Sequence, residues 1–170
     1  MKIGLLSDTH SYLDEQVFRY FDKCDEIWHA GDIGNLEVLN KLEAFKPTRA
    51  VWGNIDGKEL QARCPEHQRF ECEGMQVWMT HIGGKPPRYA KGIRPKLKEW
   101  QPDIFICGHS HILRVATDEE LNRLLYLNPG AAGQQGFHQM RTLLRFEINE
   151  KQVSQMQVIE LGKRGAVKAN

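Results

Sequence analysis

Seven side chains of the types that bind metal ions follow short apolar segments of this sequence: Asp8, His10, Asp32, Asn54, His81, His109 and His111. Carboxylate, amide and imidazole donors without a thiolate suit borderline divalent metals such as Mn, Fe or Zn, and they disfavour a cysteine-based structural zinc site. Seven ligands are too many for one ion, so we expect a binuclear centre with one shared carboxylate. Two such ions lower the pKa of a shared water from 15.7 toward about 7 and clamp a phosphate. The expected chemistry is therefore metal-assisted phosphoester hydrolysis.

The segment that carries the last two ligands is the apolar run 104–107, which ends at Gly108 and continues to His109 and His111. In extended backbone, residues two apart lie on the same side, so the two imidazoles can face one small volume. Gly108 allows the chain to bend without a Cβ clash. We expect a buried strand that leads into a metal-binding turn. A His-x-His pair alone is also common on protein surfaces, so this prediction depends on the other ligands.

The first third of the chain predicts strands that alternate with helices. The apolar runs 2–6, 26–30 and 48–52 each stop at glycine or a polar ligand, and residues 17–24 and 36–42 have apolar side chains at helical spacing. Asn35 is a suitable N-cap for the second helix. Alternation of this kind predicts a parallel sheet, whose ligand sites gather beyond the carboxyl ends of the strands. We therefore expect Asp8, His10, Asp32 and Asn54 to lie together beyond the carboxyl ends of these strands.

The later part of the chain has more of a meander pattern. Residues 68–72 and 75–80 predict a hairpin around Glu73 and Gly74, and further strands are expected over 113–117, 124–127, 142–148 and 153–159. The basic segment 85–98 is expected to form a loop and then a helix beside these ligands. Two sheets packed face to face, with helices outside, would hold both halves in one core. We expect a single domain over 1–161 and a polar tail over 162–170.

Composition narrows the class of protein. The chain has 170 residues, 41% of them hydrophobic, and a formal net charge of +1. This balance argues against bulk attraction to nucleic acid or to a membrane surface. No apolar run approaches the roughly 20 residues that span a bilayer. The four cysteines show no Cys-x-x-Cys spacing and the N-terminus lacks the pattern of a signal peptide, so a reduced, cytoplasmic location is expected.

Five ordered motifs carry a family resemblance: Asp8-x-His10, Gly31-Asp32, Gly53-Asn54-x-Asp56, His81 and Gly108-His109-Ser110-His111. In this order they resemble the calcineurin-like metallophosphoesterase superfamily, over residues 1 to about 148. The short chain and the Asn128-Pro129-Gly130 sequence look most like its small YfcE-type phosphodiesterases.

The resemblance implies an α/β fold, a four-layer α/β/β/α sandwich of two mixed β-sheets flanked by helices. It also implies two divalent metal ions per chain, with Mn as the first candidate and Fe, Zn or Ni as alternatives. One ion would be held by Asp8, His10, Asp32 and His111. The other would be held by Asp32, Asn54, His81 and His109, with Asp32 bridging the two.

The resemblance fails at two positions. Many superfamily phosphatases have a histidine after the motif Asn that protonates the leaving group, but Ile55 stands here and cannot donate a proton. Asp56 or water would have to replace it, so Asp56 is the one candidate catalytic side chain besides the metal-bound hydroxide. At the fourth motif the family often has His-Gly-His, whereas Ile82 follows His81 here.

Four further residues are candidates for supporting roles. Lys85 and Arg88 follow His81 closely and would attract an anionic substrate, although a basic run is more often a solvated helix face. His138 would border the substrate from the glycine-rich loop 130–136, or it is an exposed loop residue. Asn128 would orient a ligand side chain from behind, or it simply forms a turn.

The resulting hypothesis is a phosphodiesterase in which a metal-bridging hydroxide attacks phosphorus of a small anionic phosphoester. Two alternatives are kept. One is a phosphomonoesterase that uses the same site. The other is a non-catalytic, protein-binding scaffold of the same fold, such as the retromer subunit that shares it. A homo-oligomer is left open.

Overall fold

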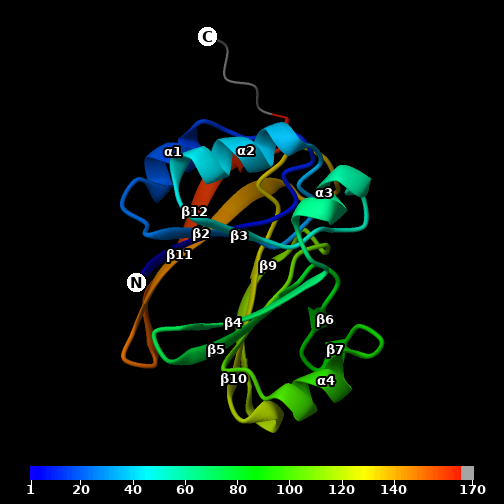
Figure 1. Cartoon of the computed structure of the whole chain (residues 1–170), viewed down its shortest axis with the longest axis vertical. Helices are drawn as coiled ribbons and strands as arrows, with labels where there is room; N and C mark the ends of the chain where they lie inside the picture. The colour runs from blue at the N-terminus through cyan, green and yellow to red at the C-terminus, as the bar shows by residue number, and fades with distance from the viewer. Residues whose placement is uncertain (166–170) are drawn as a thin grey trace.

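Two five-stranded β-sheets lie face to face, with helices on the outer side of each, in the computed structural model, which describes residues 1–165 (Figure 1). The first sheet has the strand order β12-β11-β1-β2-β3 and the second has the order β4-β5-β8-β10-β9. Strands β6 and β7 form a separate two-stranded hairpin beside α4 (Figure 1). The expected sandwich of two mixed sheets is confirmed.

The elements of the first sheet and its helices are β1 (Lys2–Leu6), α1 (Gln16–Phe21), β2 (Glu26–His29), α2 (Leu36–Phe45), β3 (Thr48–Ala50), α3 (Lys58–Arg63), β11 (Met140–Asn149) and β12 (Gln152–Lys163). The elements of the second sheet and its flank are β4 (His67–Cys72), β5 (Met75–Thr80), β6 (Gly84–Lys85), β7 (Arg88–Tyr89), α4 (Ile93–Trp100), β8 (Ile104–Ile106), β9 (Leu113–Asp118), a 3₁₀ turn (Glu119–Leu121) and β10 (Leu124–Pro129).

Three apolar clusters separate the four layers. Successive side chains of a strand point to opposite faces, so along β1 Leu6 packs with the helix-side cluster, whereas Ile3 and Leu5 belong to the cluster between the sheets. The third cluster joins the second sheet to α4 and includes Trp78 and Leu97. Helices α1 and α2 lie over one outer face and α4 over the other (Figure 1). The strands are therefore fixed from both sides, which holds the loops at their ends.

The second sheet differs from the expected meander at its centre. Its edge strands β4 and β9 are antiparallel to their neighbours, as expected, but β5, β8 and β10 run parallel. Parallel strands need a crossover connection, and α4 supplies the one between β5 and β8. In the first sheet β1, β2 and β3 are parallel as predicted. Each sheet thus has a group of parallel strands with aligned carboxyl ends.

Most expected boundaries hold within a few residues. Asn35 caps α2 by accepting the Val38 N–H at 3.0 Å, as predicted. Helix α3 was not expected, because its six residues show little apolar periodicity. Strand β12 extends to Lys163, two residues into the expected tail, and residues 166–170 of that tail lie outside the described part of the chain. Among the described residues, no helix has the length and apolar character that a membrane crossing requires.

Candidate metal centre

The seven expected ligands all follow the carboxyl ends of parallel strands. Asp8 and His10 come after β1, Asp32 after β2 and Asn54 after β3, while His81 follows β5 and the last two histidines follow β8. Backbone hydrogen bonds join these loops in pairs. The His10 N–H donates to the Asp32 carbonyl at 3.0 Å, and the Gly108 N–H donates to the His81 carbonyl at 3.0 Å.

The ligand side chains gather in two clusters. Asp8, His10 and His111 offer atoms that lie within 4.8 Å of one another, and so do Asp32, His81 and His109. The clusters are adjacent, because His10 Nε2 lies 3.7 Å from Asp32 Oδ2.

Asp32 therefore faces both clusters, with Oδ1 toward His81 at 3.2 Å and Oδ2 toward His10. Asn54 lines the same 250 Å³ cavity as Asp32 and His109. We call this the central cavity; it is lined by His10, Asp32, Asn54, Ile55, His109, Ser110, His111, Gly136 and Phe137.

Two buried atoms at this centre, Asp8 Oδ1 and His81 Nε2, have no hydrogen-bond partner among residues 1–165. Asp8 Oδ2 accepts the His109 N–H at 3.1 Å, which leaves Oδ1 free. His81 Nδ1 lies 2.8 Å from the Ala30 carbonyl, to which it donates, so Nε2 is the ring nitrogen that faces Asp32. A buried polar atom without a partner costs about 1–3 kcal/mol. Divalent cations would satisfy both atoms, so the residues present fit a metal centre.

The protonation of these groups follows from their mutual contacts. Burial alone would lower the pKa of His81, but the Asp32 and Asp8 carboxylates outweigh it and the pKa is raised. Burial would raise the pKa of Asp32, but His81 and the Ile55 N–H hold it below its usual value. Burial lowers the pKa of His10 although both carboxylates oppose the shift. A carboxylate such as Asp32, whose lowered pKa favours the ionised form, beside imidazoles forms the charge pattern that a divalent cation requires.

Backbone strain is concentrated at the same place. Five expected ligands have positive φ angles: Asp8 (54°), His10 (48°), Asp32 (53°), His109 (66°) and His111 (58°). Non-glycine residues rarely occupy this left-handed region, and clusters of such residues mark functional sites. Strand alternation does not direct the side chains of His109 and His111 in the way that we expected. Both residues lie beyond the end of β8, in bent backbone.

Two glycines are required by close packing. A Cβ on Gly108 would lie 2.0 Å from Ser7 Oγ and 2.8 Å from Asp8 Oδ2, and one on Gly53 would lie 2.1 Å from Asp32 Oδ1. Gly108 is therefore needed for the approach of the two sheets, and its expected role in bending the chain is not the main one.

The surroundings of Asp56 argue against the expected role of a proton donor. Its side chain is 3% exposed. Its Oδ2 accepts the N–H groups of Ile33 at 3.1 Å and Gly53 at 2.8 Å, and its Oδ1 accepts that of Gly34 at 2.7 Å. Both oxygens are thus bound to backbone donors. Asp56 ties the loop after β2 to the loop after β3 and so fixes Asp32 against Asn54.

His138 packs against the candidate ligand His111, and it is not among the described residues that line the central cavity. Its Nε2 donates to the Gly133 carbonyl at 3.0 Å, and its Nδ1 lies 3.2 Å from Nδ1 of His111. With Nε2 protonated, neutral His138 accepts at Nδ1, and His111 must be the donor. The lone pair of His111 is then on Nε2, which lies 3.1 Å from Asp8 Oδ1. His138 therefore orients the ring of His111.

Asn128 acts on the backbone of the turn and not on a ligand side chain. Its Nδ2 donates to the Gly108 carbonyl at 2.9 Å and to Ser110 Oγ at 3.1 Å, and its Oδ1 accepts the Gly130 N–H at 3.0 Å. These bonds hold the chain on both sides of His109.

Lys85 and Arg88 lie beside the centre together with an arginine that the sequence did not single out. They line a 270 Å³ cavity with Arg114, His109 and Ser110. A lone arginine on a strand such as β9 is ordinarily a surface residue, so no local pattern singles out Arg114. Apolar side chains also reach the rim: Ile55 is 46% exposed and Phe137 is fully exposed, and both line the central cavity.

Comparison with known families gives a match over most of the chain. The calcineurin-like phosphoesterase superfamily domain matches residues 1–151. A curated "probable metallophosphoesterase" of Methanothermobacter thermautotrophicus is 33% identical over 136 residues, which is 77% of each chain. A curated "phosphodiesterase" of Methanocaldococcus jannaschii is 24% identical over 147 residues, covering 76% of this chain and 83% of its own.

Solved structures share the fold. One, described as a novel archaeal phosphodiesterase, superposes with a TM-score of 0.76 at 22% identity, covering 95% of this chain and all of the other. Wild-type Vps29 of Entamoeba histolytica, solved with zinc, has a TM-score of 0.73 at 17% identity and covers 94% and 99%. The same fold thus occurs in proteins with different descriptions, and function has to be argued from the site.

Proposed function

The chain belongs to the calcineurin-like phosphoesterase superfamily, and on this premise we propose that it is a divalent-metal-dependent phosphodiesterase with a binuclear centre. Asp8, His10 and His111 would hold one ion, and His81, His109 and Asn54 the other. Asp32 would bridge them, since its two oxygens face different clusters. Manganese is the first candidate among metals that accept this mixture of oxygen and nitrogen donors.

The chain's own residues would prepare this centre. When bound, two divalent ions supply Lewis-acid chemistry, which polarises phosphoryl oxygens and makes water a nucleophile at neutral pH. Asp8 and Asp32 provide the negative charge that holds the cations. Asp56 and Asn128 keep the ligand loops in place, and His138 keeps the ring of His111 oriented.

One observation carries the preference for a diester. His109 and Ser110 line both the central cavity and the 270 Å³ cavity, so the centre has space on two sides. A phosphodiester carries an organic group on each of two ester oxygens, whereas a monoester carries only one. Two adjoining cavities therefore suit a diester.

The side chains of the central cavity favour a leaving group that needs no proton. Ile55 and Phe137 border the ligands there and neither can act as a general acid. We expect aryl leaving groups such as p-nitrophenolate to be released much faster than simple alcohols.

The proposal is tested with purified protein loaded with Mn²⁺. We expect kcat/KM for bis-p-nitrophenyl phosphate to exceed that for p-nitrophenyl phosphate, with about two metal ions per chain. The Asp32→Ala variant, purified in the same way, is the control for contaminating phosphatases. A higher kcat/KM for the monoester would refute the diesterase assignment and support a phosphomonoesterase.

The scaffold alternative has one observation in its favour, the fold shared with Vps29. Against it, each of the two clusters has three side chains whose ligand atoms are close enough together to hold an ion. If the metal-loaded protein hydrolysed no phosphoester at all, the scaffold assignment would replace ours.

A further inference from the structure

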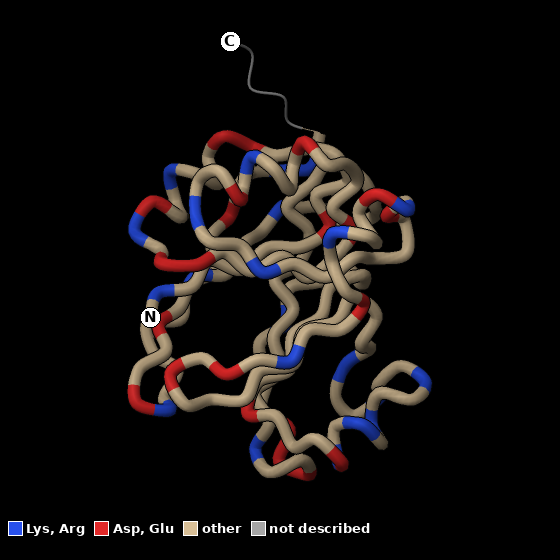
Figure 2. The backbone as a smooth tube through the Cα atoms, in the orientation of Figure 1, with Lys and Arg blue, Asp and Glu red and all other residues tan. Residues whose placement is uncertain are grey.

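The 270 Å³ cavity beside the metal centre carries three cationic side chains, and we call it the cationic cavity. It is lined by Gly84, Lys85, Arg88, Gly108, His109, Ser110, Ile112, Arg114 and Tyr126. No aspartate or glutamate is among these residues. Because His109 and Ser110 also line the central cavity, the two spaces adjoin. Lys and Arg residues are concentrated around β6, β7 and α4 (Figure 2).

The three cations have no acidic partner within the part of the chain that the structure describes. None of them contacts a carboxylate within 4.0 Å, whereas the neighbouring Arg94 is paired with Glu120. Lys85 and Arg88 stand directly opposite each other in the β6–β7 hairpin. Like charges at directly opposed positions destabilise a strand pair. An anion between them would remove this repulsion.

The hairpin is anchored so that the cations stay together. The Tyr126 hydroxyl donates to the Gly84 carbonyl at 2.7 Å, and the Tyr89 hydroxyl donates to Asp118 Oδ2 at 2.6 Å. Arg114 Nη2 lies 3.4 Å from the Pro86 carbonyl at the tip of the hairpin. The positive charges are thus arranged in advance, which lowers the entropic cost of binding an anion.

Two other hollows are lined by an acidic side chain as well as by cations. The 350 Å³ hollow beside Asn54 and His81 is lined by Lys91 and Lys96, but Glu66 also lines it, and Lys96 Nζ lies 3.5 Å from His67 Nε2.

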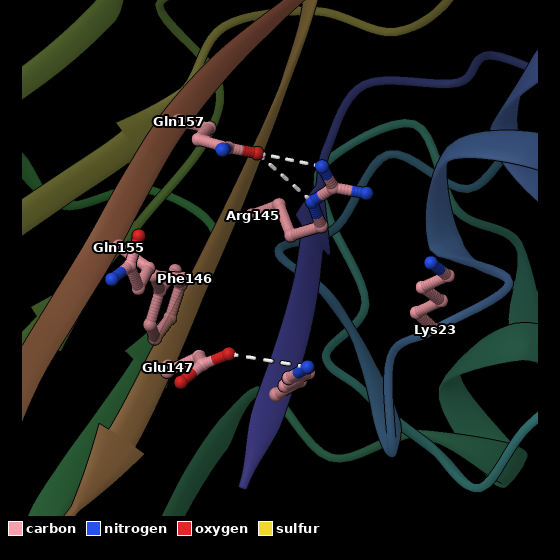
Figure 3. Close-up of a pocket in the computed structure, with 7 residues that line it drawn as sticks. Lys23, Arg145, Phe146, Glu147, Gln155 and Gln157 are labelled. Atoms are coloured by element: carbon pink, nitrogen blue, oxygen red, sulfur yellow. Dashed lines mark hydrogen bonds and ion pairs between the residues drawn. The ribbon is translucent and has the colours of Figure 1, made fainter.

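A hollow at the amino end of β1, opposite the metal centre, is lined by both signs of charge (Figure 3). There Lys2 pairs with Glu147 at 3.3 Å, and Arg145 donates to Gln157 Oε1 at 2.6 Å. Lys2 and Arg145 already have acceptors and Glu147 brings a negative charge, so Lys23 is the one remaining cation among the described residues that line this hollow, and the need for an anion is smaller there.

We propose that the cationic cavity binds a second phosphate group, carried by the substrate on the organic substituent that lies next to His109. This inference rests on the proposed function, because it assigns the substrate as a phosphodiester with a further phosphomonoester. Guanidinium and ammonium groups bind phosphate through charge-assisted hydrogen bonds, and arginine does so with two parallel donors. The remaining apolar lining from Ile112 and Tyr126 would contact the organic part.

A matched pair of substrates tests the proposal. Thymidine 5′-(p-nitrophenyl phosphate) is compared with the same compound carrying a 3′-phosphate, using the Mn²⁺-loaded protein. We expect kcat/KM to be about tenfold higher for the 3′-phosphorylated compound, the gain from one good charge-assisted contact. Lys85→Gln and Arg114→Gln should each reduce that ratio. Lys98→Gln removes the same charge from the outer surface of α4 and should leave the ratio unchanged.

A binding measurement keeps this test independent of catalysis. Calorimetry with thymidine 3′,5′-bisphosphate and metal-free protein should show binding that weakens about tenfold in Lys85→Gln but not in Lys98→Gln. If neither substrate is hydrolysed while this Lys85-dependent binding persists, the proposed function fails and the phosphate site stands. Equal kcat/KM values for the two substrates, or an equal loss of binding in Lys98→Gln, would overturn the phosphate site.

Discussion

Replacing Asp56 with alanine should destabilise the protein even when no metal is present. The carboxylate of Asp56 is buried and accepts three backbone N–H groups, from Ile33, Gly34 and Gly53. Alanine leaves these donors without an acceptor in a space that is mostly closed to water. The loops after β2 and β3 would then separate, and Asp32 would lose its fixed position.

The size of the effect follows from the hydrogen bonds that are lost. A hydrogen bond to a charged group contributes about 1.5–3 kcal/mol net, and partial hydration of the vacated space returns some of it, so we expect a loss of about 4 kcal/mol. For a chain of this length each kcal/mol corresponds to roughly 2–4 °C in Tm, so the midpoint should fall by about 8–16 °C. Urea and thermal unfolding in EDTA measure this loss without any contribution from bound metal.

The control is Glu59→Ala, which removes one carboxylate of the same charge from an exposed position in α3 nearby. It should change the free energy of unfolding by no more than about 0.5 kcal/mol. A loss below about 1 kcal/mol in Asp56→Ala, together with slower release of poor leaving groups, would refute our reasoning. That result would restore Asp56 as a proton donor.

Three further predictions concern the ligands and the thiols. Asp32→Ala should lower the bound metal for both ions, whereas His10→Ala should chiefly weaken one; two ions per chain in the Asp32 variant, measured by elemental analysis, would argue against bridging. His138→Ala should weaken one of the two metal-binding steps by about tenfold or more, because the orientation of the His111 ring is lost. A calorimetric titration measures this change, and identical isotherms for the variant and the wild type would contradict the role of His138. Burial raises the pKa of Cys107 to about 12, so iodoacetamide should not alkylate it in the native protein at pH 8 but should do so after unfolding, as mass spectrometry can record.

The sequence was sufficient to predict two mixed sheets, and it selected seven candidate ligands, six of which the structure brings together in two clusters. Apolar runs that stop at glycine and a polar ligand recur at Asp8, Asp32 and Asn54, and the alternation with helices predicts that these strands are parallel. Both properties are local, because strand and helix periodicity can be read within about ten residues. The position of the site, at the carboxyl ends of the strands, follows from strand direction alone.

Contacts between residues far apart in the chain decided the rest. Asp56 lies two residues after Asn54 and His138 two residues after Gly136, but nothing in their local pattern shows that Asp56 binds the loop 23 residues before it or that His138 lies against His111. The parallel direction of the central strands of the second sheet was also not predicted, since the hairpin at β4 and β5 dominates the local pattern.

The two histidines of the last motif show the same division. Their sequence spacing of two predicted that both imidazoles face one volume, and the sequence by itself determined that they are ligand candidates. The family resemblance implied that His111 joins Asp8 and His10 and that His109 joins Asp32 and His81, and the packed sheets bring these side chains together. The physical reason is that both residues lie in left-handed backbone beyond the strand, where side-chain direction depends on contacts with the opposite sheet.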